Sequence, residues 1–469
     1  MKRILGVIVV GLLAAGGLAA CNDDDGGGGG GGGSASAECP LEALEDAEGT
    51  VEITMWHGLN QANEEALQAL VTSFNDSQED VQVNLVNQSS YDDIFEKFLT
   101  GLTTGDLPDV VQGQEILLQQ YIDTETILPA QACIDAEDYD TSDYVERAIN
   151  YYTVEDTTWA LPFNPSNPVF LYNKNMFREA GLDPEDPPTT LTELRATAET
   201  IAESGISGLD APMAIKNDPW FLEQWSAKAN ELFANNNNGR EARATEVLFD
   251  NDTGLEIFTF LQDMVADGLA FPTSTEGGGA IDNLLAVGGL RAAMTIDSSA
   301  FLGTAQQALE RGEYGETDPG IGPMPGPEGD GGVLVGGASL MIVNSSPPEK
   351  QAAAWEFMKF ATSPEQQALF AAATGYIPVR ISSADNPVLQ QRWEVVPGMK
   401  VAYDQLVEGA DTDATAGATI GPFKAIRDIV QEEQEEMLQG GKDAAQALAD
   451  AAQRANDEIT DYNDRIGAG

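Results

Sequence analysis

The sequence contains few of the residues on which catalytic and metal sites usually depend. Among its 469 residues there are three cysteines and one histidine, His57. A single histidine leaves little room for a Ser-His-Asp triad or for a transition-metal centre. Neither a Gly-x-Ser-x-Gly elbow nor a Walker loop nor an EF-hand loop occurs. The sequence therefore predicts no catalytic residue, no metal site and no cofactor.

Basic residues are also scarce. The chain has 23 lysines and arginines against 77 acidic residues, a formal net charge of −54, and the acids are spread along the chain after Glu38. Without a basic surface to neutralise phosphates, nucleic acid is excluded as a partner. A dispersed acidic surface suits salty surroundings, where ions screen the self-repulsion over a few ångströms. We interpret it as a solvated surface adapted to salt.

The sequence has no long apolar run, and its apolar run at the N-terminus is short. Lys2 and Arg3 precede an apolar run from Ile4 to Ala20, which ends in Leu-Ala-Ala before Cys21. About 20 apolar residues are needed to span a bilayer, so we expect an export signal, with a short anchor helix as the alternative. The ending resembles a bacterial lipobox. This implies that 1–21 is a lipoprotein signal peptide and that Cys21 is lipidated, which would hold the protein at a membrane surface.

The next segment, 22–49, contains eight consecutive glycines from Gly26 to Gly33. Such a segment buries no apolar area, so we expect a flexible tether. Beyond Cys21 only Cys39 and Cys133 remain. In an exported chain two leftover cysteines are more often paired than free, so we predict a disulfide between them.

Strand-like and helix-like patterns alternate along the chain. A length of 469 residues exceeds one ordinary core, so we expect two lobes. The alternation predicts α/β lobes with mostly parallel sheets flanked by helices. Ligands of such sheets bind beyond the carboxyl ends of strands, where Glu115 follows the strand 109–112. Farther along, Met294 to Ile296 predicts a strand and Lys350 to Ala372 predicts a helix.

The richest motif runs from Trp159 to Leu194. Pro165 and Pro168 hold the chain extended around Ser166, and the apolar residues that follow predict a buried strand. A helix then runs from Lys174 to Ala180, and Gly181 is placed to end it in the left-handed conformation. A small polar residue between two prolines at the start of a strand can present a hydroxyl and backbone N–H groups to a ligand.

This motif resembles the interlobe crossover of the extracellular solute-binding proteins that serve ABC importers, and especially of sn-glycerol-3-phosphate-binding proteins. The resemblance extends from about Val51 to the C-terminus, with further matches at 55–57, 335–340 and 374–378. It implies the two-lobed type II periplasmic-binding-protein-like fold with hinged crossovers. Lobe 1 would comprise 50–163 and 338–385, and lobe 2 would comprise 168–336 and 390–469.

The resemblance also implies a set of ligand-binding residues. Arg427 would hold a phosphate through bidentate bonds, and the Glu115 carboxylate would accept bonds from a diol at the other end of the ligand. Hydroxyls, aromatic rings and a close backbone approach would complete the site. The remaining members are Tyr91, Ser166, Trp220, Ser298, Ser299, Gly337 and Tyr376.

Most of these residues have a structural alternative. Arg427 could form a surface salt bridge with Asp428 or a nearby Glu, and Glu115 could be one more solvated acid. Either serine of the 298–299 pair could cap a helix. Gly337 could mark a strand bulge, and the tyrosines could pack in a core. Trp56 and His57, at a predicted strand end, fit local packing better than ligand binding.

Asn217 stands where the family places a second cleft tryptophan, with Trp220 matching the first. Losing one aromatic wall would widen the pocket, which favours a larger glycerophosphodiester such as glycerophosphocholine. Its quaternary ammonium could lie against Trp220 or a tyrosine ring through cation–π attraction.

The expected function is capture of glycerol-3-phosphate or a glycerophosphodiester by a lipid-anchored, exported monomer. By resemblance, its partners would be an ABC permease with its ATPase subunits, and the membrane through the lipid anchor. A sugar or oligosaccharide ligand is the alternative within the family. A secreted hydrolase and a tethered adhesin are alternatives outside it.

Overall fold

The structure, a computed structural model, describes residues 38–273, 281–313 and 317–468. The predicted signal segment 1–21, the lipidation residue Cys21 and residues 22–37 of the predicted tether lie outside the described residues. Among the described residues, no helix combines the length and the apolar character needed to cross a bilayer.

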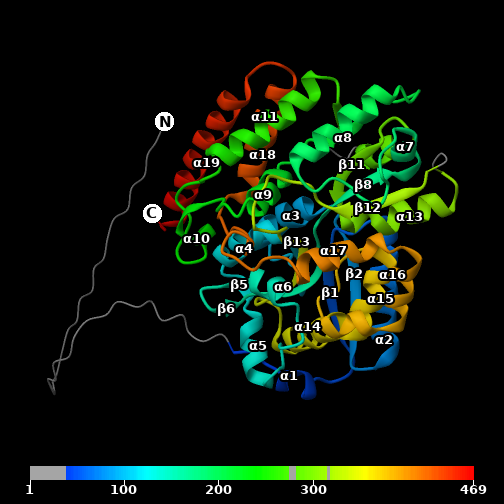
Figure 1. The fold of residues 1–469 in the computed structure, drawn as a ribbon. Coiled ribbons are helices and arrows are strands. Elements are labelled where there is room, and N and C mark those ends of the chain that lie inside the picture. Colours follow the sequence, from blue (N-terminus) through cyan, green and yellow to red (C-terminus); the bar gives the residue numbers. More distant parts are fainter. Residues whose placement is uncertain (1–37, 274–280, 314–316, 469) are drawn as a thin grey trace, which may run out of the picture. The chain divides into compact units, whose positions relative to one another are not determined.

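The first sheet has its strands in the order β2-β1-β3-β13-β4, and β7 also pairs with β13 (Figure 1). β1 pairs in parallel with β2 and β3, whereas β13 runs antiparallel to β3, β4 and β7. Its strands are β1 (Val51–His57), β2 (Val81–Asn87), β3 (Val110–Gln114), β4 (Ile127–Leu128), β7 (Leu161–Ser166) and β13 (Gly336–Val343).

The second sheet has the order β10-β9-β11-β8-β12. β9, β10 and β11 are parallel, and β8 is antiparallel to both β11 and β12. Its strands are β8 (Pro168–Asn173), β9 (Met213–Lys216), β10 (Ala270–Thr273), β11 (Met294–Ser298) and β12 (Pro319–Pro323). A separate small hairpin consists of β5 (Thr153–Val154) and β6 (Thr157–Thr158).

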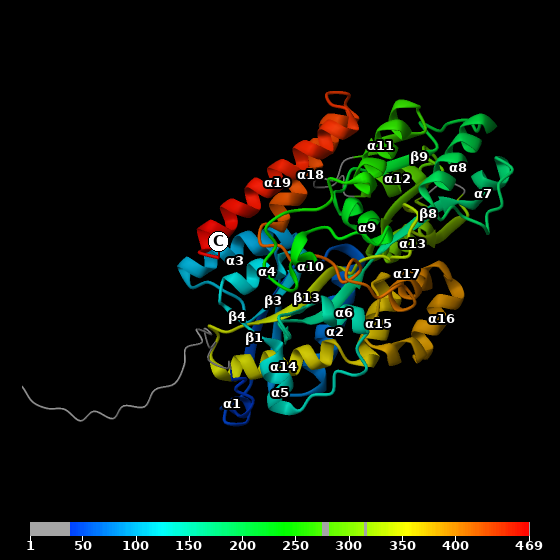
Figure 2. The same cartoon turned by 60° about the vertical axis from the view of Figure 1, so that its left-hand side comes forward.

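Helices cover both sheets, as Figures 1 and 2 show. Around the first sheet lie α1 (Glu42–Glu45), α2 (Gln61–Ser77), α3 (Tyr91–Thr104), η1 (Glu115–Leu117), α4 (Leu118–Asp123), α5 (Ala130–Glu137), α6 (Glu146–Tyr151), α14 (Pro348–Ala361), α15 (Pro364–Thr374), η4 (Ile381–Asp385) and α16 (Pro387–Val395). Around the second lie α7 (Lys174–Glu179), α8 (Leu191–Ser204), α9 (Trp220–Lys228), α10 (Asn235–Gly239), α11 (Asp252–Ala266), α12 (Asp282–Gly288), η3 (Ser299–Phe301), α13 (Leu302–Glu310), α17 (Gly398–Val407), α18 (Phe423–Leu438) and α19 (Ala444–Ile466).

These two groups of elements are the lobes, called lobe 1 and lobe 2 below. The chain passes from β7 to β8 at Asn167 and returns between β12 and β13. It crosses a third time between α16, which packs on α15, and α17, which packs on β12. The two-lobed α/β fold confirms the prediction. Each sheet also has antiparallel strand pairs, which the sequence did not predict. They arise because β8 and β13 each come next in the chain after a strand of the other lobe. The sequence limits given for the lobes stay a prediction.

Local signals explain several helix ends. The Ser90 hydroxyl accepts a hydrogen bond from the Asp93 N–H at the start of α3, and Gly105 ends that helix in the left-handed conformation. Thr190 and Glu193 form a reciprocal capping box at the start of α8. Gly181 follows α7 with a positive φ, as expected from the sequence.

One helix prediction was wrong. The segment Lys350–Ala372, expected as a single helix, is split between α14 and α15, which are separated by Thr362 and Ser363. Pro364 has no backbone N–H to continue the first helix but suits the first turn of the second.

The core of lobe 1 includes the one disulfide of the described residues, which joins Cys39 to Cys133 over a separation of 94 residues. It ties the segment before α1 to α5. Both cysteines are buried in the same apolar cluster as Trp355 and Phe357 of α14.

Candidate functional site

A cleft of about 1230 Å³ lies between the lobes. Lobe 1 lines it with the residues before α2, the residues around the start of α3 and Tyr376. Lobe 2 contributes the end of β9, η3 and one face of α18. The cleft therefore lies beyond the carboxyl ends of β1 and β9, where α/β sheets generally bind ligands.

The wall of the cleft is acidic. Six carboxylates and a single lysine, Lys216, line it, and the carboxylates belong to Asp92, Asp93, Asp218, Asp428, Glu432 and Glu435. Lys216 is itself held by Asp297 at 3.2 Å and by Asp218 at 3.6 Å. Lys424 pairs with Asp428 and, across the lobes, with Asp92. The cleft as a whole thus attracts cations and repels anions.

A chain of polar side chains supports the lobe 1 side of the cleft. The Gln112 side chain accepts a bond from the Gly58 N–H and donates to the side-chain oxygen Oδ1 of Asn164 at 2.9 Å. The Asn164 amide donates to the Tyr91 hydroxyl at 2.9 Å, and this hydroxyl lies 3.5 Å from the Tyr376 hydroxyl. Because the Tyr91 oxygen already accepts a bond, its proton remains available to Tyr376 or to a ligand.

Deeper in the site, Arg427 of α18 meets two buried glutamates. Its Nε and Nη2 donate to the two oxygens of Glu223 on α9, at 2.6 and 2.8 Å. Nη2 also donates to Oε1 of Glu115 in lobe 1, at 3.1 Å. The side chains of Glu115 and Glu223 are 3% and 5% exposed and that of Arg427 is 12% exposed. Arg427 therefore does not form the surface salt bridge with Asp428 considered above.

Arg427, Glu115 and Glu223 form a buried triad of charges, and the pKa of each glutamate is shifted by a charged neighbour in the triad. Burial raises the pKa of Glu115 to about 7, an effect that Arg427 opposes and that the negative charge of Glu223 increases. Burial also raises the pKa of Glu223, again opposed by Arg427. Oε2 of Glu115 is buried and has no hydrogen-bond partner among the described residues. An unpartnered buried carboxylate oxygen is costly, so it is well suited to accept a bond from a ligand.

Of the sequence-predicted ligand residues, only Tyr91 and Tyr376 line the open cleft. Glu115 and Arg427 lie behind it. Ser166 is buried at the end of β7, where it pairs with Gly336.

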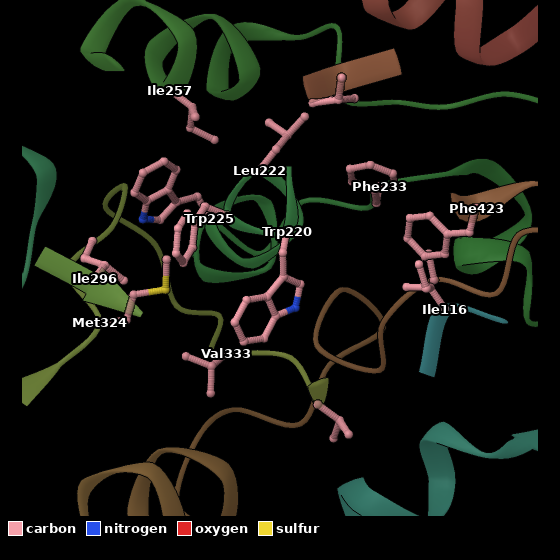
Figure 3. Close-up of a cluster of buried hydrophobic side chains, with 14 of the residues drawn as sticks. Ile116, Trp220, Leu222, Trp225, Phe233, Ile257, Ile296, Met324, Val333 and Phe423 are labelled. Carbon is pink, nitrogen blue, oxygen red and sulfur yellow. The ribbon is translucent and has the colours of Figure 1, made fainter. Parts of the chain in front are cut away.

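Trp220 is buried rather than exposed to the cleft. It belongs to the apolar cluster that includes Trp225 and Phe233 (Figure 3). Its ring covers the backbone at the second crossover, where a Cβ on Gly336 would lie 2.6 Å from the indole. The structure thus places Trp220 between the hinge and the core of lobe 2.

Gly337 and Ser298 have clear structural roles. Gly337 has a φ of +97°, and a Cβ there would lie 2.2 Å from the Asn164 carbonyl oxygen, beside a register shift in β13. The Ser298 hydroxyl accepts a bond from the Ala300 N–H and so caps η3. Ser299 differs, because its hydroxyl is fully buried and without a partner among the described residues.

His57 lies buried at the end of β1, and burial lowers its pKa. Its Nδ1 has no partner among the described residues. Within the part of the chain that the structure describes, no group of three or more His, Cys, Asp or Glu side chains is arranged to hold a metal ion.

Three residues of this site were missed by sequence reasoning. Asn164 lies in the crossover motif beside Ser166 and could have been noticed there. Glu223 follows Trp220 by three residues on α9, hence on the same face, but in a chain with 77 acids it carried no distinguishing signal. Lys216 had no signal beyond its position before Asn217.

A second arginine also joins the lobes. Asp123, at the end of α4, binds Arg243 through both oxygens and accepts a bond from the Tyr462 hydroxyl at 2.7 Å. Gln119 also donates to this carboxylate at 2.9 Å. Arg243 follows a turn in which Asn236, Asn237 and Asn238 all have positive φ, and the Asn236 amide donates to the Arg243 carbonyl.

In sequence, the chain is similar to bacterial solute-binding proteins. The family of bacterial extracellular solute-binding proteins matches residues 69–397. The sn-glycerol-3-phosphate-binding periplasmic protein UgpB of Rhizobium meliloti is 28% identical over 422 residues, covering 88% of this chain and 95% of that protein. The corresponding protein of Pectobacterium atrosepticum is also 28% identical, with 87% and 91% covered.

Solved structures share the fold. UgpB from Mycobacterium tuberculosis in complex with glycerophosphocholine superposes with a TM-score of 0.73 at 20% identity, covering 88% of this chain and 99% of that one. The cyclic alpha-maltosyl-1,6-maltose binding protein from Arthrobacter globiformis has a TM-score of 0.70 at 24% identity, with 88% and 100% covered.

Proposed function

Since the chain belongs to the bacterial extracellular solute-binding proteins, which serve ABC importers, we propose that it captures a glycerophosphate-type solute between its lobes. The solute is glycerol-3-phosphate or a glycerophosphodiester. A ligand that contacts both lobes favours the closed state. The closed protein then delivers it to a membrane permease powered by ATPase subunits.

The observation that carries this proposal is the meeting of Arg427 and Glu115 from opposite lobes, 3.1 Å apart, with Glu115 Oε2 left without a partner among the described residues. A guanidinium edge suits a phosphate oxygen, and a carboxylate suits the hydroxyls of a glycerol unit. The hydroxyls of Tyr91 and Tyr376 lie beside this pair. The curated relatives, named as glycerol-3-phosphate-binding proteins, support the same ligand class.

The remaining predicted ligand residues enter the proposal in a secondary role. Closure would bring the ligand against the hinge, where the buried Ser299 hydroxyl is still without a partner among the described residues. Trp220, Ser166 and Gly337 would shape the end of the pocket through the crossover backbone. Ser298 would act through its cap of η3.

A neutral sugar is the second candidate, and the acidic cleft favours it. Six carboxylates line the cleft, and they oppose an anionic ligand far more than an uncharged polyol. The solved structure of a maltosyl-maltose-binding protein has the same fold, which accommodates such ligands.

The test is isothermal titration of the purified protein with glycerol-3-phosphate, glycerophosphocholine and maltose, followed by mass spectrometry of the recovered ligand. Saturable binding of either glycerophosphate, with the ligand recovered intact and the melting temperature raised, supports the proposal. Binding of maltose alone would instead support the sugar-binding function. Recovery of a cleaved diester would instead favour the secreted hydrolase that the sequence left as an alternative.

The N-terminal segment completes the proposal. Cys21 would anchor the exported monomer at the outer face of the cell membrane or in the periplasm, and 22–49 would tether the lobes to it. The dispersed acidic surface would keep the protein soluble in salt. Metabolic labelling with a radioactive fatty acid, compared with a Cys21→Ser variant, tests the anchor.

A further inference from the structure

Arg427 lies behind the open cleft, and three of its five N–H donors are already used. The Glu223 carboxylate matches its Nε–Nη2 edge in a fork-to-fork arrangement, with bonds of 2.6 and 2.8 Å. The remaining Nη2 proton is directed to Glu115 at 3.1 Å. Only Nη1 has no hydrogen bond within the described residues, which leaves one nitrogen of the guanidinium to bond a ligand.

The charge of Arg427 is also already balanced. With both glutamates ionised, the triad carries two negative charges and one positive, in a setting where the side chains are 3% to 12% exposed. Charges interact strongly when water is excluded. Because burial raises the pKa of Glu115 to about 7, an incoming anion meets this net charge of −1 at a pH above that value, where the Glu115 carboxyl is ionised.

The two kinds of glycerophosphate differ in this respect. A phosphate monoester carries close to two negative charges at neutral pH, because its second pKa is about 6. A phosphodiester carries one, and a choline or ethanolamine head group cancels it.

The acids of α18 are placed to receive such a cationic head group. Glu435 lies two helical turns beyond Arg427 on the same helix face, roughly 12 Å along the axis, and Asp428 and Glu432 lie between them. All three acids line the open cleft. A ligand with its phosphate at Arg427 and its other end toward the mouth of the cleft would pass along this wall.

We propose that Glu223 sets the charge of the accepted ligand: by pairing with Arg427 it makes the site reject dianionic phosphate monoesters and accept zwitterionic glycerophosphodiesters. The inference rests on the proposed function for the identity of the ligand. Glu223 acts through Arg427 and is a positioning and charge-setting residue. The fork-to-fork pair also fixes the guanidinium through Nε and Nη2 and leaves Nη1 unbonded within the described residues.

The test compares wild type with Glu223→Gln, which keeps a hydrogen-bond acceptor for Arg427 but removes the charge. Titration with glycerophosphocholine and with glycerol-3-phosphate gives a selectivity ratio for each protein. Wild type should prefer the diester at least tenfold, and Glu223→Gln should reduce that preference at least tenfold, mainly through tighter binding of glycerol-3-phosphate. Glu223→Asp, which keeps the charge, should retain the wild-type preference.

Glu203→Gln is the matched control, because Glu203 is exposed on α8 and its loss changes the net charge equally. Its selectivity should equal that of wild type. An unchanged ratio in Glu223→Gln, with a normal thermal melt, would reduce Glu223 to a structural support and overturn the proposal. If Glu223→Gln does not fold, wild type alone decides: equal or tighter binding of glycerol-3-phosphate than of the diester also overturns it.

Failure of the proposed role of Glu223 can be distinguished from failure of the proposed function. If wild type binds neither glycerophosphate, that function fails, and inorganic phosphate then serves as the probe. Phosphate binding gained by Glu223→Gln but absent from wild type and Glu203→Gln would still support the charge-setting role. No gain would refute it.

Discussion

Two arginines of lobe 2 hold the two ends of one short segment of lobe 1. This segment, η1 and α4, begins at Glu115, which meets Arg427, and ends at Asp123, which meets Arg243. Both are arginine–carboxylate pairs across the lobes. They differ in how completely the carboxylate is satisfied.

Asp123 accepts bonds on both oxygens, from Arg243, Tyr462 and Gln119. Glu115 has one bonded oxygen and one that is buried without a partner among the described residues. A fully satisfied pair gains nothing further from a ligand, whereas an unsatisfied one does. The comparison separates a contact that holds the lobes together from a contact poised to bind.

The largest effect should follow from breaking the Glu115 end. Arg427→Met leaves two buried carboxylates unpaired, and we expect a loss of about 3–5 kcal/mol of stability together with loss of ligand binding. Thermal and urea unfolding measure the first, and calorimetry measures the second.

A matched set of variants checks the reason for this loss. If unpaired charge causes it, adding Glu115→Gln and Glu223→Gln to Arg427→Met should restore most of the stability but none of the binding. Arg243→Met is the counterpart at the other end. A loss there as large as that of Arg427→Met would contradict the contrast between the two pairs.

The next effect is the pH dependence that the titration of Glu115 contributes. Its pKa is about 7 in the folded protein and near 4.5 when unfolded, so the protonated form is favoured by folding. The stabilisation is complete below about pH 4.5 and is lost as the pH rises through 7. Relative to wild type, Glu115→Gln should therefore become more stable between these limits, by roughly 3 kcal/mol at the upper one.

Unfolding of both proteins at intervals from pH 4.5 to 8 measures that difference. Asp123→Asn serves as the comparison, because it removes a carboxylate at the other end of the same segment. A constant difference between Glu115→Gln and wild type across this range would show that Glu115 does not titrate there. At pH 8 the same variant should bind ligand at least tenfold more weakly, since a carboxylate accepts stronger bonds than an amide.

A smaller effect is expected at the Asp123 end. Arg243→Met removes an arginine that is 32% exposed and leaves Asp123, whose side chain is 7% exposed, with its bonds from Tyr462 and Gln119, so we expect a loss of about 1 kcal/mol of stability. Small-angle scattering without ligand should show more of the open form. Affinity should fall severalfold for every ligand alike, because the closed state itself is weakened. A change in ligand selectivity would contradict this.

The smallest effect belongs to the mouth of the cleft. Glu435→Gln removes one solvated acid, and we expect less than about 0.5 kcal/mol change in stability. Its signature should be a weaker salt dependence of the association rate for a cationic ligand, measured by stopped flow. An affinity loss as large as that of Glu115→Gln would contradict the distinction between the mouth and the deep site.

Local signals were sufficient for much of the framework. The strand after Pro168 and the turn at Gly181 were both predicted from residues within one turn of each feature. The pairing of Cys39 with Cys133 also matches the expectation for an exported chain. The single helix predicted over 350–372 was wrong because Pro364 can begin a helix as well as end one.

The site was predicted less completely. Matching motifs singled out Arg427 and Glu115, and the structure brings them into contact. The partner that balances Arg427, Glu223, was not predicted, nor was the Asp123 contact with Arg243. In a chain with 77 acidic residues, no local pattern distinguishes the few carboxylates that become buried from the many that stay solvated.

Chain length and hydrophobic period indicated two α/β lobes, because hydrophobic period acts on neighbouring residues, and the resemblance of the 159–194 motif to a known family indicated the crossover between the lobes. Tertiary structure alone decided which charges meet. Arg427 and Glu115 are 312 residues apart, and the environment of each depends on how completely the packed lobes exclude water around it. That exclusion turns an abundant surface residue type into a buried carboxylate with one oxygen left to bind.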